Sequence, residues 1–263
     1  MKIKNYVSSA LIILFCIILA NYTFGPSNFV NNCLFLLTPV IAVLFGIYAL
    51  GTYRLSNDHG KVMSLLTTGI MFWLIGESIF FLFQFTWHIS PYPSIADVFY
   101  LIGYPLIFIG LTKEILIHKV DLRNFNKLYM TLIVLLLTVL AIIVSYFGIY
   151  RSYSADDSFL GNAISIAYGV GDLILIAPGL FVLKMALDYR GGKLYNSWIL
   201  VLFALLCMLS GDVLFAIFSD QYTDLIWPYT LIDIAYVLSY LLFGYSFFYT
   251  ATTIKDLHSK LKK

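Results

Sequence analysis

Charged side chains are scarce in this sequence. Asp, Glu, Lys and Arg make up 11% of the 263 residues, whereas hydrophobic residues make up 61%. A soluble domain carries roughly 25% charged residues, because its surface has to be solvated by water. With a mean hydropathy of +0.90, this chain excludes an ordinary soluble domain and predicts a membrane protein covered by the lipid bilayer. The net charge of +2 is too small to favour a nucleic-acid partner.

Other absences narrow the chemistry. The three cysteines, Cys16, Cys33 and Cys207, have no CxxC or Cys/His spacing, so neither a disulfide framework nor a metal site is expected from them. No HExxH or GxSxG motif is present, so no catalytic residue is predicted, although enzymatic activity stays open. Retinal would need a lysine within a helix, and haem a histidine pair at mid-membrane. The four histidines, His59, His88, His118 and His258, make no such pair, so neither cofactor is expected.

Eight segments are apolar over the roughly 20 residues that a membrane-spanning helix needs. The first could pass for a signal peptide, but we expect a retained helix, because the topology needs it. We therefore predict an all-α polytopic membrane protein that forms a single domain over residues 1–263, with a short basic tail at 255–263. The expected spans are 6–22, 30–53, 62–85, 95–117, 128–150, 160–186, 196–218 and 229–252.

The placement of basic residues predicts the orientation. If the N-terminus is cytoplasmic, all but one of the 16 lysines and arginines fall in cytoplasmic segments, and only Arg151 falls outside. Such an excess of Lys and Arg on the cytoplasmic side is the general rule for membrane proteins. The pattern predicts that both termini lie in the cytoplasm. The cytoplasmic set is Lys2, Lys4, Arg54, Lys61, Lys113, Lys119, Arg123, Lys127, Lys184, Arg190, Lys193, Lys255, Lys260, Lys262 and Lys263.

Polar residues recur as if the chain were two related halves, about 1–125 and 126–254. Gly76-Glu77 precedes PYPSIAD at 91–97, and Gly211-Asp212 precedes WPYTLID at 227–233. The same number of residues separates Asp97 from Asp233 and Tyr100 from Tyr236. Because each half would hold four helices, the two copies would have the same orientation in the membrane. We predict two like-oriented four-helix repeats.

Two of the carboxylates within the expected spans lie near a helix start. Asp97 follows Ser94, and Asp233 follows Thr230, at the spacing of a capping box, in which hydroxyl and carboxylate bond the first backbone amides of a helix. A negative group there also meets the positive end of the helix dipole. We expect Asp97 and Asp233 to be helix caps first, with contact to a ligand as the alternative.

Glu77, Asp172 and Asp212 lie too far along their helices to be caps. A charge near the centre of a spanning helix costs about 2.5–3.5 kcal/mol on insertion scales, so such residues usually face protein or water. Without a nearby Lys or Arg, each must be protonated, bonded to hydroxyl groups, or paired with an external cation. One interpretation is a structural network, and the other is a site for a proton, a metal cation or an organic cation. The candidate partners are Tyr100, Tyr104, Tyr168, Tyr236 and Tyr240.

The stretch PYPSIADVFYLIGYPLIFIGL, residues 91–111, carries a resemblance. Together with Tyr168–Leu175, Gly211–Phe215, Trp227 and Asp233, it resembles the multi-helix membrane input regions that precede diguanylate cyclase or histidine kinase domains in bacteria and archaea. The resemblance covers most of the last six spans. It implies a sensory function in the plasma membrane of a prokaryote, but no defined ligand. This chain ends about ten residues after the last span, so an output domain would be a separate protein.

Three functions from different classes stay open on the sequence alone. The first is a membrane-embedded sensory or ligand-binding module that signals through a cytoplasmic or membrane partner. The second is a small proton- or cation-coupled transporter or channel that uses Glu77, Asp172 and Asp212. The third is a structural subunit of a larger membrane complex, in which the acids only hold helices together.

Overall fold

A computed structural model describes residues 2–25, 27–53, 55, 57–118, 126–150, 153, 158–188 and 194–261. Over these residues the chain forms helices and no strand, and eight of the helices are long and apolar enough to cross a membrane. The prediction of an all-α polytopic membrane protein with eight spans is confirmed. The basic residues Arg54, Lys119, Arg123, Arg151, Arg190, Lys193, Lys262 and Lys263 lie outside the described residues.

All eight expected spans are present, with ends that differ by a few residues. The helices are α1 (Lys2–Phe24), α2 (Asn28–Tyr53), α3 (Asp58–Phe81), α4 (Ile95–Ile117), α5 (Lys127–Ile143), α6 (Phe159–Asp188), α7 (Tyr195–Thr223) and α8 (Tyr229–Leu261). Two π-helical segments, η1 (Leu82–Trp87) and η3 (Val144–Tyr150), continue α3 and α5. The largest difference is at α8, which continues well beyond residue 252.

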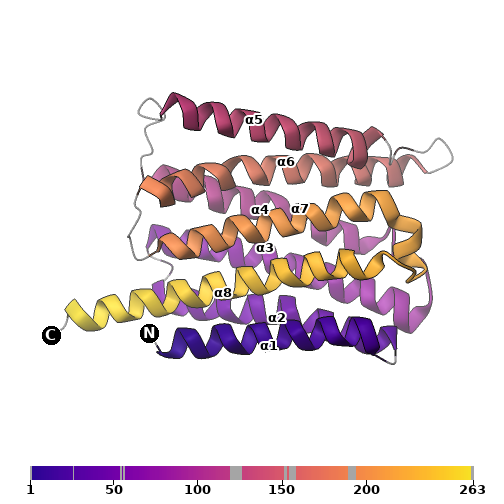
Figure 1. Cartoon of the computed structure of the whole chain (residues 1–263), viewed down its shortest axis with the longest axis horizontal. Helices are drawn as coiled ribbons and strands as arrows, with labels where there is room; N and C mark the ends of the chain where they lie inside the picture. Colours follow the sequence, from indigo (N-terminus) through magenta and orange to yellow (C-terminus); the bar gives the residue numbers. More distant parts are fainter. Residues whose placement is uncertain are drawn as a thin grey trace.

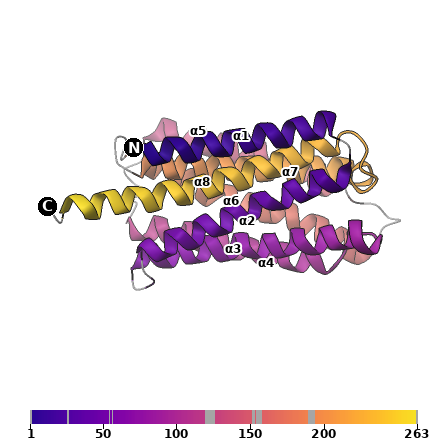
Figure 2. The same cartoon turned by 90° about the horizontal axis from the view of Figure 1, so that it is seen from below.

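The helices run side by side and alternate in direction, with α1 at one edge of the bundle and α5 at the other (Figure 1). The start of α1 and the end of α8 lie at the same end of the bundle, which we call the terminal end; the opposite end is the far end. From below, α8 is seen to extend beyond its neighbours at the terminal end (Figure 2).

The burial of the spans shows which helix is central. About 61% of the apolar span of α8 is buried inside the protein, against 6% for α1 and 11% for α5. The two edge helices therefore present most of their surface to lipid, whereas α8 packs against its neighbours along much of its length. A polar residue on α8 consequently has to find its partners within the protein.

Glycines bring α3 and α4 into close contact. A Cβ atom at Gly103 would lie 3.0 Å from the backbone oxygen of Gly69 and 2.3 Å from Nε1 of Trp73. Small residues at such positions let two membrane helices approach closely. The Trp73 indole then donates a hydrogen bond to the backbone oxygen of Tyr100 at 3.1 Å. This packing fixes the part of α4 that carries Tyr100 and Tyr104.

Candidate functional site

Glu77 of α3 is held by two tyrosines from different helices. The hydroxyl of Tyr100, on α4, donates to Oε2 at 2.9 Å, and the hydroxyl of Tyr240, on α8, donates to Oε1 at 2.9 Å. Both carboxylate oxygens therefore have a donor within the protein. This arrangement joins three helices through one side chain and accounts for an acid deep in an apolar span.

Asp212 and Asp172 form the second part of the site. Asp212, on α7, accepts hydrogen bonds from Tyr236 of α8 and from Tyr104 of α4, both at 2.7 Å. The hydroxyl of Tyr104 also lies 3.2 Å from Oδ1 of Asp172, on α6. One hydroxyl group therefore lies within hydrogen-bonding distance of both carboxyl groups. Four helices thus meet at one pair of acids.

The protonation of Asp172 and Asp212 decides which hydrogen bonds the two side chains can make. An ionised carboxylate can only accept hydrogen bonds, whereas a protonated carboxyl group has one O–H to donate. The hydroxyl of Tyr104 has one proton, so it can donate to only one of the two carboxyl groups at a time. A proton on the other carboxyl group would let that group donate to the hydroxyl oxygen in return. The pair is therefore a place where a proton or another cation would be stabilised.

The glycine before each acid makes room for a tyrosine ring. A Cβ atom at Gly76 would lie 2.8 Å from the ring of Tyr100, and one at Gly211 would lie 2.5 Å from the ring of Tyr236. Each of these tyrosines bonds the acid that follows the glycine. The contacts between α3 and α4 thus parallel those between α7 and α8, as two related halves would require, and the repeat itself stays a prediction.

Asp97 has the capping function that its spacing predicts. Ser94 and Asp97 form a capping box at the start of α4, with the Ser94 backbone amide donating to Oδ2 of Asp97 at 2.6 Å. The other oxygen accepts a hydrogen bond from the hydroxyl of Tyr168, on α6, at 2.7 Å. Asp97 therefore both starts α4 and ties it to α6.

The expected capping box at Thr230 and Asp233 does not form. The α8 helix already begins at Tyr229, so Thr230 lies within the helix instead of preceding it. The Asp233 carboxylate accepts hydrogen bonds from Tyr22 of α1 at 2.5 Å and from Tyr222 of α7 at 2.7 Å. Spacing alone could not reveal this, because both donors come from other helices.

We call these residues the carboxylate–tyrosine network. It comprises the acids Glu77, Asp97, Asp172, Asp212 and Asp233 and the tyrosines Tyr22, Tyr100, Tyr104, Tyr168, Tyr222, Tyr236 and Tyr240. The ion pairs found over the described residues, Lys61–Asp58 and the contacts of His59 and His118 with Glu114, involve none of the five acids. Asp97, Asp172 and Asp233 are buried, whereas Glu77 and Asp212 keep some solvent-accessible surface.

Every acid and tyrosine singled out from the sequence takes part in this network, but the sequence reasoning missed two of its members. Tyr22 and Tyr222 lie near the far end, where aromatic residues are common at a membrane interface, so nothing in their positions distinguished them.

A second group of polar residues, outside the network, was also missed in the sequence. His59, Glu114 and His118 come together at the terminal end, and only the Glu-x-x-x-His spacing within α4 could have signalled it.

Comparison with known proteins adds nothing to this geometry. No protein-family model, no curated protein and no solved structure matches the chain. Function therefore has to be argued from the residues themselves.

Proposed function

We propose that the protein is a membrane-embedded sensory module whose ligand is a proton or another cation, bound at the carboxylate–tyrosine network, and which signals through a partner protein. The network offers carboxylate and phenol oxygens and no basic side chain. Such a donor set attracts positive charge and repels anions. The low dielectric of the interior strengthens both effects.

The carboxyl pair provides the switching element. Adding or removing a proton at Asp172 and Asp212 changes whether one of the two carboxyl groups can donate, and so changes their hydrogen bonds to the hydroxyls of Tyr104 and Tyr236. Because those two tyrosines lie on α4 and α8, the change alters contacts between helices of both predicted halves. A ligand shifts such an equilibrium only by its difference in affinity for the two arrangements. For a proton or another cation, that difference comes from the positive charge that it adds to the carboxyl pair.

The observation that carries the proposal is the course of α8. This central helix supplies Asp233, Tyr236 and Tyr240 to the network and then continues as a mostly exposed arm, residues 255–260, at the terminal end. With 33 residues it is about 50 Å long at 1.5 Å per residue, whereas the hydrocarbon core is about 30 Å thick. One rigid element thus joins the network to a surface that a partner can contact.

The proposed orientation in the membrane rests on the distribution of the basic residues. We place the terminal end in the cytoplasm of a prokaryotic cell, because the basic residues Lys61, Lys113, Lys255 and Lys260 are on that side. The far end, with the network nearer to it, then faces outward, as a sensor of external conditions needs. The proposal of a sensory function is also supported by the resemblance to membrane input regions of signalling proteins and by the expected four-plus-four repeat.

Spin-label distances test the proposal. We would replace the three native cysteines by alanine and attach labels at Gly51→Cys, at the end of α2, and Ser259→Cys, on the arm. The expected result is a distance distribution that shifts between acidic and alkaline buffer and no longer shifts in Asp212→Asn. Asp58→Asn, at an exposed carboxylate, is the matched control and should keep the response. A fixed distance in the folded parent protein contradicts a sensory function.

A proton or cation transporter is the second candidate. The intermediate exposure of Glu77 and Asp212, beside the buried Asp172, favours it, because an ion pathway needs acids that are not fully enclosed by protein. Flux through proteoliposomes separates the two functions. Transport that is lost in the Glu77→Gln/Asp212→Asn double variant would establish a pathway, whereas a helix response without flux supports the sensor. If the double variant only loses its fold and neither activity exists, the acids are structural.

A further inference from the structure

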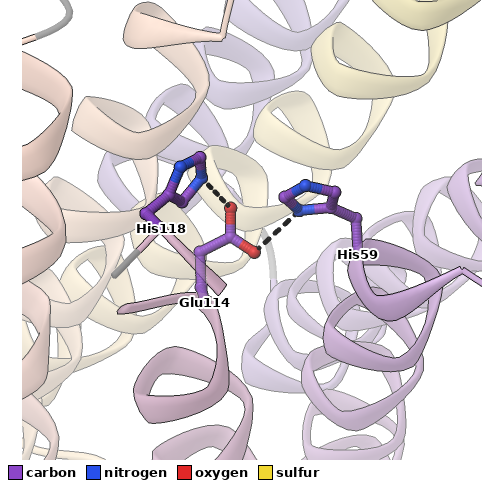
Figure 3. Close-up of side chains that lie close together, drawn as sticks. All are labelled: His59, Glu114 and His118. Carbon is purple, nitrogen blue, oxygen red and sulfur yellow. Dashed lines mark hydrogen bonds and ion pairs between the residues drawn. The ribbon is translucent and has the colours of Figure 1, made fainter. Parts of the chain in front are cut away.

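A second polar cluster lies at the terminal end, opposite the network. His59 Nδ1 lies 3.1 Å from Oε2 of Glu114, and His118 Nε2 lies 3.2 Å from Oε1 of the same carboxylate. Figure 3 shows the two imidazole rings converging on Glu114 from opposite sides. One ligand atom from each of the three residues lies within 4.8 Å of the others. The proposed function uses none of these side chains.

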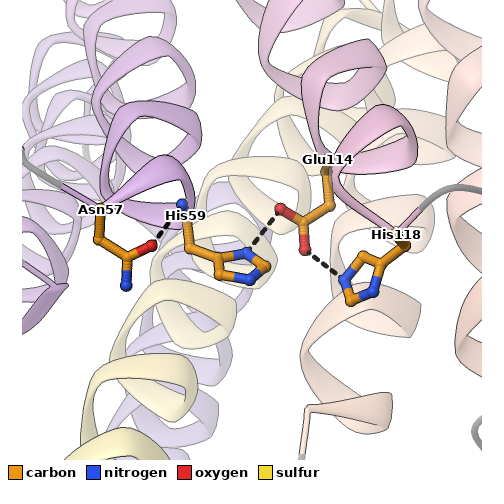
Figure 4. A network of polar contacts seen from close by, with 4 residues as sticks. All are labelled: Asn57, His59, Glu114 and His118. Atoms are coloured by element: carbon orange, nitrogen blue, oxygen red, sulfur yellow. Dashed lines mark hydrogen bonds and ion pairs between the residues drawn. The ribbon is translucent and has the colours of Figure 1, made fainter.

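The ends of two helices hold the cluster in place. His59 is in the first turn of α3, where the Asn57 side chain caps the helix by accepting from the His59 amide at 3.1 Å (Figure 4). Glu114 is in the last turn of α4. His118 caps that helix, and its backbone amide donates to the backbone oxygen of Glu114. Residues four apart share a helix face, so Glu114 and His118 necessarily point the same way.

The burial of the three side chains is graded in a way that suits ion binding. The Glu114 side chain is 1% exposed, whereas those of His59 and His118 are 30% and 31% exposed. The carboxylate is thus enclosed by protein, while the imidazoles line the side that water can reach. The ring of Tyr53, 6.0 Å from the ring of His59 between centroids, forms part of the wall.

We infer that His59, Glu114 and His118 form a binding site for a divalent transition-metal ion. Two imidazoles and one carboxylate are the donor set of many zinc sites, which leave a fourth position for water or substrate. Bonds of 2.0–2.2 Å in a tetrahedron place ligand atoms roughly 3.4 Å apart. Each histidine nitrogen is already close to that distance from a Glu114 oxygen, with His59 near Oε2 and His118 near Oε1. Imidazole selects zinc, copper, nickel or iron over magnesium and calcium.

The same geometry would serve a purely hydrogen-bonded pair of histidines on a buried carboxylate. A metal ion differs from that arrangement in what it does to the fold, because it joins the start of α3 to the end of α4 through coordinate bonds. It also takes up an exchangeable ligand on its exposed side. This site is independent of the proposed function, since it shares no residue with the carboxylate–tyrosine network.

Cobalt(II) binding to the full chain in detergent tests the inference, with purification by a tag that contains no histidine. We expect one Co²⁺ per chain and the visible absorption of a tetrahedral Co²⁺ centre. His59→Ala and His118→Ala should each weaken binding by at least about tenfold, since even the loss of groups that only support a ligand costs 10–100-fold. His88→Ala and His258→Ala, elsewhere in the chain, are the matched controls and should change nothing.

Absence of Co²⁺ binding by the folded parent protein overturns the inference, as does unchanged binding in the His59→Ala/His118→Ala double variant. A measurement without substitutions guards against loss of the fold. Zn²⁺ should protect His59 and His118, but not His88 or His258, from modification by diethyl pyrocarbonate. Equal modification of all four histidines with and without Zn²⁺ also refutes the site.

Discussion

The hydroxyl of Tyr104, on α4, donates to the Asp212 carboxylate, on α7, at 2.7 Å. The two residues belong to different predicted halves of the chain, and Tyr104 is buried. Asp172 of α6 lies within hydrogen-bonding distance of the same hydroxyl. Tyr104 therefore joins the acids of α6 and α7 to α4.

Removing this hydroxyl should destabilise the protein. In Tyr104→Phe the carboxyl pair loses a donor that water cannot easily replace, and an unsatisfied buried polar group costs about 1–3 kcal/mol. We expect a loss of about 1–2 kcal/mol, because hydrogen bonds between membrane helices are at the weaker end of that range. Unfolding in SDS measures it. Tyr6→Phe, at an exposed tyrosine, should have no effect, and an equal loss in both variants would count against the bridging function of Tyr104.

The glycines beside the acids should be intolerant of a methyl group. Gly76→Ala and Gly211→Ala would press Cβ against the rings of Tyr100 and Tyr236, and such overpacking typically costs about 1–3 kcal/mol. Gly51→Ala is the matched control, because a Cβ there meets nothing within 4 Å. It should stabilise α2, since alanine favours a helix by up to about 1 kcal/mol over glycine. Thermal unfolding in detergent compares the three variants, and similar stabilities for all of them would contradict the close ring contacts.

The two hydroxyls at capping-box spacing should behave differently. Ser94→Ala removes the N-cap of α4 and should cost about 1 kcal/mol. Thr230→Ala should stay within about 0.5 kcal/mol of the parent, because Thr230 is already inside α8. Chemical denaturation of the two variants gives the comparison. Equal losses would show that both residues cap their helices.

The predicted orientation can be measured in intact cells. With the native cysteines replaced, a membrane-impermeant maleimide should label Ser90→Cys, in the far-end loop, without lysis. It should label Ser259→Cys, on the α8 arm, only after the cells are opened. We expect this result because lysines are concentrated at the terminal end, and segments rich in lysine and arginine stay on the cytoplasmic side of a membrane. Labelling of Ser259→Cys in intact cells would show that the orientation is opposite to the predicted one.

The sequence reveals far more of the fold than of the site. Runs of apolar residues are local signals, so all eight spans could be predicted, and the start of α4 at Ile95 follows from the capping-box spacing of Ser94 and Asp97. The hydrogen-bond partners of the acids are set by which helices lie next to each other. Nothing local to Asp233 points to Tyr22 or Tyr222, which approach it from α1 and α7. Likewise His59 and Glu114 come together only because α3 and α4 pack closely along the glycines.

The binding of a proton at Asp172 and Asp212 is the central claim, and infrared spectroscopy measures it most directly. A protonated carboxyl group has a C=O stretch distinct from that of a carboxylate. We expect the purified protein at neutral pH to show this band, and we expect Asp172→Asn and Asp212→Asn each to lose the contribution of the pair. In Asp58→Asn the band should be unchanged. A parent protein without a protonated carboxyl band, or a band that survives both substitutions intact, would contradict the account.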